Sequence, residues 1–105
     1  MISKKIEKAL NKQIWHEGSS SQYYLAMASW AETQGLSGVS KFLYEHSDEE
    51  REHMMKIVRF VNERGGHATI PGFDEPPSSF KSLKDVFEAI LQHELAVTNE
   101  INELV

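Results

Sequence analysis

The sequence predicts an all-α domain, an antiparallel helix bundle that contains one long crossover loop. Three observations support this fold class. Apolar residues recur at alternating steps of three and four along three long segments, glycines stand at the ends of the first two segments, and a proline-containing stretch separates the second from the third. At 105 residues the chain has the length of one small domain, residues 1–105.

The first helix is expected over residues 3–33, because one face of this segment carries a continuous stripe. Gly18 lies within this helix, where glycine costs about 1 kcal/mol relative to alanine, and we expect it to loosen the helix locally. Gly35 and Gly38 flank a short turn, and Ser37 is expected to cap the next helix. The stripe comprises Ile6, Leu10, Gln13, Glu17, Ser20, Tyr24, Met27 and Ala31.

The second helix is expected over residues 37–64 and ends at the pair Gly65-Gly66, which is typical of a helix C-terminus. Because only a short turn separates it from the first helix, the two should pair antiparallel. Its stripe comprises Val39, Leu43, His46, Glu50, His53, Ile57, Phe60 and Arg64.

A loop of 18 residues, 65–82, follows and contains Pro71, Pro76 and Pro77. At about 3.3 Å per residue it can reach about 60 Å, whereas a helix of this size is about 42 Å long. The third helix, residues 83–105, can therefore start at the opposite end of the bundle and run parallel to the second. An antiparallel third helix would fit almost equally well, and only the loop length favours the parallel arrangement.

The third helix is expected to begin at a Ser82 cap. Its stripe comprises Leu83, Phe87, Ile90, Glu94, Val97, Ile101 and Leu104. No glycine or proline stops it, and no fourth helix follows, so we expect an open bundle with one uncovered, apolar side.

Composition excludes several classes of function. Sixteen acidic residues against 11 basic ones give a net charge of −5, which disfavours nucleic acid as a partner. The absence of cysteine excludes disulfides, thiolate zinc sites, iron–sulfur clusters and a cysteine nucleophile. No signal peptide or membrane span is visible, and the expected location is cytoplasmic. Any metal must bind to oxygen and nitrogen.

Each stripe carries one glutamate near its middle, and Glu17, Glu50 and Glu94 fall at one level of the bundle. Burying an uncompensated carboxylate costs many kcal/mol, so three of them facing one core require cations, mutual hydrogen bonds or protonation, and a divalent or trivalent metal ion is the simplest of these solutions. His53 follows Glu50 by three residues and shares its helix face. A single glutamate on such a stripe usually reaches solvent, but three at one level favour a metal centre.

Other polar residues near this level have weaker support. His16, His46 and His93 carry no comparable constraint, and a histidine on a stripe is more often a hydrogen-bonded core residue than a ligand. Tyr24, seven residues after Glu17, can bring its hydroxyl close to the carboxylates.

These motifs, in this order, resemble the ferritin family, specifically the non-haem bacterial ferritins, over essentially all 105 residues. The first helix resembles theirs through Glu17 and the run from Ser20 to Tyr24. The second matches through Glu49-Glu50-Arg51-Glu52-His53, and the crossover and third helix match through Pro71, Pro76-Pro77 and Glu94.

The resemblance implies a ferroxidase and iron-storage subunit with a di-iron centre. Glu17, Glu50 and His53 would bind one iron, Glu50 would bridge to the second, and Glu94 would bind that second iron. Glu49 would bind a third iron in transit, and Tyr24 would tune the chemistry with oxygen or peroxide.

The resemblance further implies a homo-oligomeric shell of 24 subunits that encloses ferric mineral. Haem is not expected, because haem-binding members have methionine where this chain has Arg51. Complete members continue into a fourth helix with further ligands, so we expect this chain to be part of a longer protein.

Two other hypotheses compete with this one. A short ferritin-like chain could complete its di-iron site by dimerisation, which would leave Glu94 and the crossover without a clear role. A non-catalytic helical interaction module would instead pair its glutamates with basic residues of a partner and would not depend on iron.

Overall fold

The computed structural model describes the backbone of residues 1–104 and the side chains of residues 1–96. It contains three helices, α1 (Lys4–Thr33), α2 (Ser37–Glu63) and α3 (Leu83–Leu104), and no strand among these described residues. The predicted all-α class is confirmed, and the observed helix ends lie within one residue of those expected up to residue 104. Val105, expected to end the third helix, lies outside the described residues.

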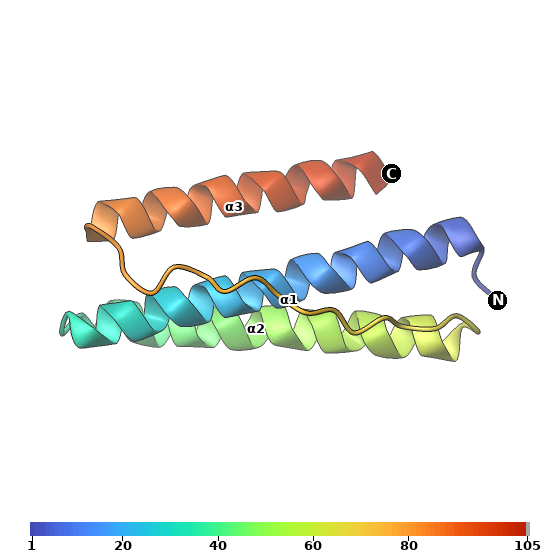
Figure 1. Ribbon diagram of the computed structural model, residues 1–105, viewed down its shortest axis with the longest axis horizontal. Helices are drawn as coiled ribbons and strands as arrows, with labels where there is room; N and C mark the ends of the chain where they lie inside the picture. Colours follow the sequence, from blue (N-terminus) through green and yellow to red (C-terminus); the bar gives the residue numbers. More distant parts are fainter. Residues whose placement is uncertain (105) are drawn as a thin grey trace.

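Figure 1 shows how the chain is arranged along its 49 Å long axis. Helices α1 and α2 lie side by side and antiparallel. The crossover, residues 64–82, then runs back along them, and α3 starts near the α1–α2 turn and runs parallel to α2. The parallel third helix favoured by the loop length is therefore the one observed.

Left-handed glycines end the first two helices. Gly35 has φ +73° and Gly65 has φ +82°. After each glycine the chain forms a Schellman motif, in which Leu36 N–H donates to Ala31 O and Gly66 N–H donates to Val61 O, both at 3.0 Å. Only glycine adopts this backbone without a steric penalty, which explains why both predicted stops were correct.

Of the two predicted N-terminal caps, one is observed and the other is not. The Ser82 hydroxyl accepts a hydrogen bond from Asp85 N–H at 3.2 Å, as a capping residue should. The expected Ser37 cap was wrong, because the tight turn at Gly35 puts Leu36 at the N-cap, without a side-chain cap. The Leu36 side chain packs against the core instead.

Two apolar clusters form the core, one toward each end of the α1–α2 pair. The one nearer the N-terminus of α1 is called the lower cluster, and the one nearer the α1–α2 turn is called the upper cluster. The lower cluster contains Ile14, Met54, Val61 and Ala68. The upper cluster contains Tyr24, Met27, Ala28, Trp30, Ala31, Leu43 and Val86. Residues 17–21 and 47–53, which carry most of the polar side chains discussed below, lie between the two clusters.

Helix α3 is rotated relative to the predicted stripe. Val86 is fully buried in the upper cluster, whereas Phe87, predicted to face the core, is 50% exposed. Phe87, Leu91 and Leu95 form a separate exposed row at intervals of four residues. No helix of the described residues is long and apolar enough to cross a bilayer.

Helix α1 is continuous through Gly18 and is not loosened there as expected. Gly18 is instead the point at which the crossover packs against α1. A Cβ atom at this position would lie 2.1 Å from Phe73 Cζ and 2.9 Å from Met54 Sδ. The missing side chain therefore lets Phe73 of the crossover lie directly on α1.

We predict that Gly18→Ala destabilises the protein by about 1 to 3 kcal/mol, because overpacking outweighs the gain in helix propensity. Gly38→Ala is the control, since Gly38 is also helical and has no atom within 4 Å of the added Cβ. It should be neutral or slightly stabilising. Denaturant unfolding of both variants measures the difference.

Adding Phe73→Ala to Gly18→Ala should remove the clash, so the double variant should be less destabilised than the sum of the two single changes. Simple additivity would contradict the proposed contact between Gly18 and the crossover.

Candidate metal centre

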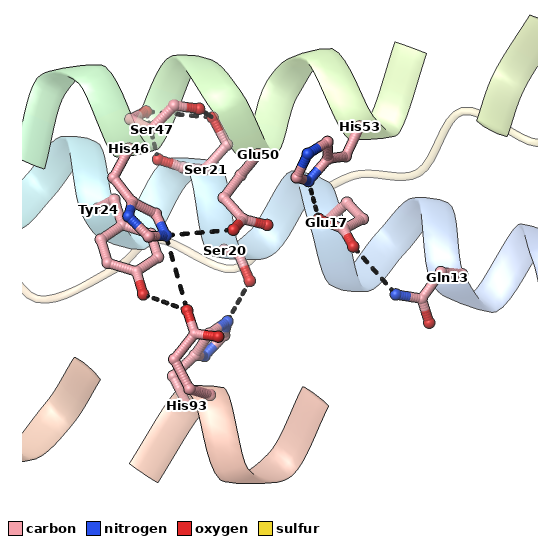
Figure 2. Close-up of polar contacts among 11 residues, drawn as sticks. Gln13, Glu17, Ser20, Ser21, Tyr24, His46, Ser47, Glu50, His53 and His93 are labelled. Atoms are coloured by element: carbon pink, nitrogen blue, oxygen red, sulfur yellow. Dashed lines mark hydrogen bonds and ion pairs between the residues drawn. The ribbon is translucent and has the colours of Figure 1, made fainter. Parts of the chain in front are cut away.

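The polar layer between the two apolar clusters brings the predicted carboxylates together. Glu17 comes from α1, Glu50 from α2 and Glu94 from α3. Figure 2 shows Glu17 and Glu50 in the same region, and one ligand atom of Glu94 lies within 4.8 Å of one of Glu50. Glu17 and Glu50 lie on the inner faces of their helices because they are in step with the neighbouring apolar residues, whereas the side chain of Glu94 is 47% exposed. The single level predicted for the three glutamates is therefore observed.

Glu17, Glu50 and His53 form the first group of possible metal ligands. One ligand atom from each lies within 4.8 Å of the other two. His53 Nδ1 is 3.6 Å from Glu17 Oε2, and Gln13 Nε2 donates to Glu17 Oε1 at 3.1 Å. Glu17 Oε2 is buried without a hydrogen-bond partner. A buried carboxylate oxygen that accepts no hydrogen bond and faces an imidazole fits a metal cation well.

A second group contains His46, Glu50 and Glu94, again with ligand atoms within 4.8 Å of one another. His46 Nε2 lies 3.3 Å from Glu50 Oε1 and 3.7 Å from Glu94 Oε1. Glu50 belongs to both groups. His46 was set aside in the sequence, although its spacing of four residues before Glu50 was the available signal.

Tyr24 and Glu49 differ in how they relate to this site. Tyr24 is buried, and its hydroxyl donates to Glu94 Oε1 at 2.5 Å. Glu49 is exposed and belongs to neither group of possible ligands found among the described residues.

Several contacts fix α3 at this level. The Ser20 hydroxyl is hydrogen-bonded to His93 Nε2, and the His93 ring stacks on Tyr23 with 6.0 Å between ring centroids. Burial lowers the pKa of His93, which favours its neutral form. On the other side, Ser21 Oγ donates to Ser47 O at 2.8 Å and holds α1 against α2.

Crowding of the carboxylates governs the electrostatics. Burial raises the pKa of Glu50 to about 8, helped by a hydrogen bond from its carboxyl group to Glu17 and by the charges of Glu17, Glu94 and Glu49. Burial and the contact with Glu94 also raise the pKa of Tyr24. The site thus concentrates negative charge, which bound protons or a metal ion must neutralise.

This donor set selects a class of metal. Carboxylate oxygens and neutral imidazole suit divalent and trivalent transition ions, and ferrous and ferric iron belong to that class. The arrangement can hold two ions side by side, because Glu50 faces both groups of ligands.

The metal-free protein should lose stability as pH rises from about 4.5 to about 8. Because folding raises the pKa of Glu50, its stabilising contribution is complete below the unfolded value of 4.5 and disappears above about 8. Denaturant unfolding in the presence of a chelator, from about pH 5 to 9, measures this dependence.

Glu50→Gln, which stays neutral, should flatten the pH dependence and be more stable than the original protein near pH 8. Glu45→Gln is the control, because Glu45 is exposed on the same helix. If both variants keep the original pH dependence, crowding at Glu50 is not its source.

Comparisons with known proteins agree with this geometry. A family model described as Ferritin-like domain matches residues 7–105. A probable bacterial non-heme ferritin-like protein of Haemophilus influenzae is 43% identical over 105 residues, which are all of this chain and 64% of that protein. A bacterial non-heme ferritin of Campylobacter jejuni is 40% identical, over all of this chain and 63% of that protein.

Solved structures give the same result. A ferritin from Chlorobium tepidum superposes with a TM-score of 0.93 at 40% identity, covering 99% of this chain and 64% of that one. An open-pore ferritin from Archaeoglobus fulgidus gives 0.94 at 42% identity, with the same coverage. This chain spans somewhat less than two thirds of the length of these relatives, and over that span it belongs to the ferritin family.

Proposed function

We propose that the protein containing this chain is an iron-storage subunit that oxidises Fe²⁺ at a di-iron centre and stores Fe³⁺ as mineral in a homo-oligomeric shell. One observation carries the proposal. Carboxylates from three helices converge beside His53, two of them, Glu17 and Glu50, are only 12% and 14% exposed, and Glu50 belongs to both groups of possible ligands. The non-heme ferritin names of the relatives support it.

In this proposal, Glu17, Glu50 and His53 bind the first Fe²⁺, and Glu50 and Glu94 bind the second. Two neighbouring Fe²⁺ ions would supply the two electrons that, with two protons from solvent, reduce oxygen to hydrogen peroxide, or hydrogen peroxide to two water molecules. Hard carboxylate oxygens stabilise Fe³⁺ more than Fe²⁺, so this set of ligands favours the loss of an electron from each ion.

Two further residues have proposed roles. Tyr24 donates its hydroxyl hydrogen to Glu94, so it sits where it can adjust the second iron position. Glu49 is exposed beside Glu50 and would hold a third iron on its way past the centre. We further propose that the shell contains 24 subunits. We do not propose haem, because Arg51 occupies the position after Glu50 at which haem-binding members have methionine.

The two competing hypotheses have less support. Glu94 reaches the site from the same chain, which gives it and the crossover a role that the dimerisation hypothesis does not provide. The side chains of Glu17 and Glu50 are only 12% and 14% exposed, which is unfavourable for pairing with basic residues of a partner.

We predict that Glu50→Ala slows rapid Fe²⁺ oxidation by at least about 100-fold, because it removes a ligand from both iron positions. Glu94→Ala should impair mainly the second position and slow oxidation less. Stopped-flow oxidation of two Fe²⁺ per subunit in the full-length protein measures both effects.

Glu45→Ala is the matched control on α2 and should oxidise iron at the original rate. An original rate in Glu50→Ala would contradict the di-iron centre. A large drop in the melting temperature of metal-free Glu50→Ala would instead indicate that Glu50 is a structural pairing residue, as the interaction-module hypothesis requires.

A further inference from the structure

We propose that a surface pocket between α1, the crossover and α3 is a binding site for a guanidinium group. The pocket has a volume of about 210 Å³ and is lined by Trp15, Ser19 and Tyr23 of α1, by residues 74–77 of the crossover and by His93 of α3. The three glutamates of the metal centre are not among these lining residues. The inference therefore goes beyond the proposed function and does not depend on it.

The α1 side of the pocket is a notch between two aromatic rings. Trp15, Ser19 and Tyr23 follow one another at intervals of four residues, so they share one face of the helix. At a rise of about 1.5 Å per residue, Trp15 and Tyr23 are about 12 Å apart along the helix axis. Because the Ser19 side chain is small, the space between the two rings stays open.

Contacts within the protein hold the walls of this pocket in place. Tyr23 stacks on His93 with 13° between the ring planes, and His93 is hydrogen-bonded to Ser20 (Figure 2). Phe73 packs on Gly18, which brings the next crossover residues, 74–77, against α1. The pocket is therefore largely formed before any ligand binds, which lowers the entropic cost of binding.

The charges at the pocket favour a cation. Asp74 and Glu75 are exposed, and neither forms an ion pair with another residue that the structure describes. No lysine or arginine is among the described lining residues, so the two carboxylates would repel an anionic ligand. Trp15 is 39% exposed and offers an indole ring, the aromatic surface to which cations bind best.

A guanidinium group fits these features better than a metal ion or an ammonium group. Asp74 and Glu75 belong to neither group of possible metal ligands found in the described part of the chain. Guanidinium is flat, stacks on aromatic rings and donates paired hydrogen bonds to a carboxylate, whereas ammonium is a compact, strongly hydrated charge. Pockets for drug-sized ligands usually measure about 300 to 1,000 Å³, so this smaller pocket suits one such group with a short alkyl stem.

The test uses the full-length, metal-free protein at low ionic strength, with saturation-transfer NMR of the probe in competition titrations. Butylguanidinium and butylammonium carry the same charge on the same stem, so their comparison isolates the planar head group. The variants are Trp15→Leu and the double change Asp74→Asn with Glu75→Gln. The matched controls are Leu25→Ala, an exposed apolar residue of α1, and Glu63→Gln, an exposed carboxylate of α2.

We expect butylguanidinium to bind at least about threefold more tightly than butylammonium. Trp15→Leu should weaken its binding about three- to thirtyfold, and the double carboxylate change should weaken it at least about threefold. Neither control should alter it. Equal affinities for the two probes, or undiminished binding in the double carboxylate variant, would overturn the proposal. The double variant decides even if Trp15→Leu does not fold, because both carboxylates are exposed.

Two further probes identify the source of the guanidinium group. Agmatine represents a free small molecule, and a blocked tripeptide with a central arginine represents a partner protein. Tighter binding of either one supports the proposal and names its source, whereas binding of neither would overturn it. All of these measurements are made without iron, so their failure would leave the proposed iron oxidation intact, and an unaltered oxidation rate in Glu50→Ala would leave the pocket intact.

Discussion

The cost of burying like charges in one layer is the constraint on which the rest of this molecule depends. Glu17 and Glu50 lie between two apolar clusters, with Glu94 completing the set from α3. Without a cation, protonation neutralises part of the charge of this layer, as the raised pKa of Glu50 indicates. Replacing buried charges by an apolar layer of the same shape is often neutral or stabilising, so the stability of the fold does not account for the carboxylates.

Hydrogen bonds directly beside the carboxylates hold the three helices together at this layer. Reciprocal serine contacts bring α1 and α2 together beside the carboxylates, with Ser47 Oγ also donating to Ser21 O at 2.7 Å. Ser20 and Tyr24 reach across to His93 and Glu94, so α3 is fixed at the level of the site by polar contacts. The same residues that order the site therefore also dock the third helix.

The crossover has a similar double role. It returns the chain to the end of the bundle where α2 begins, which makes α3 parallel to α2 (Figure 1). It also packs Phe73 on the bare backbone of Gly18, immediately after Glu17. A glycine that weakens helix propensity is thus compensated by a contact that only a residue without a side chain permits.

The sequence by itself determined the helices, their glycine stops and the shared level of the three glutamates, because all of these follow from local periodicity and backbone preference. It also favoured the parallel third helix through the length of the loop. Only the tertiary structure decided that Val86 rather than Phe87 is buried, that Gly18 receives the crossover, and that His46 faces Glu50 and Glu94. The physical reason is that periodicity defines a stripe on each helix, but the rotation of one helix against another is set by side-chain packing between distant segments.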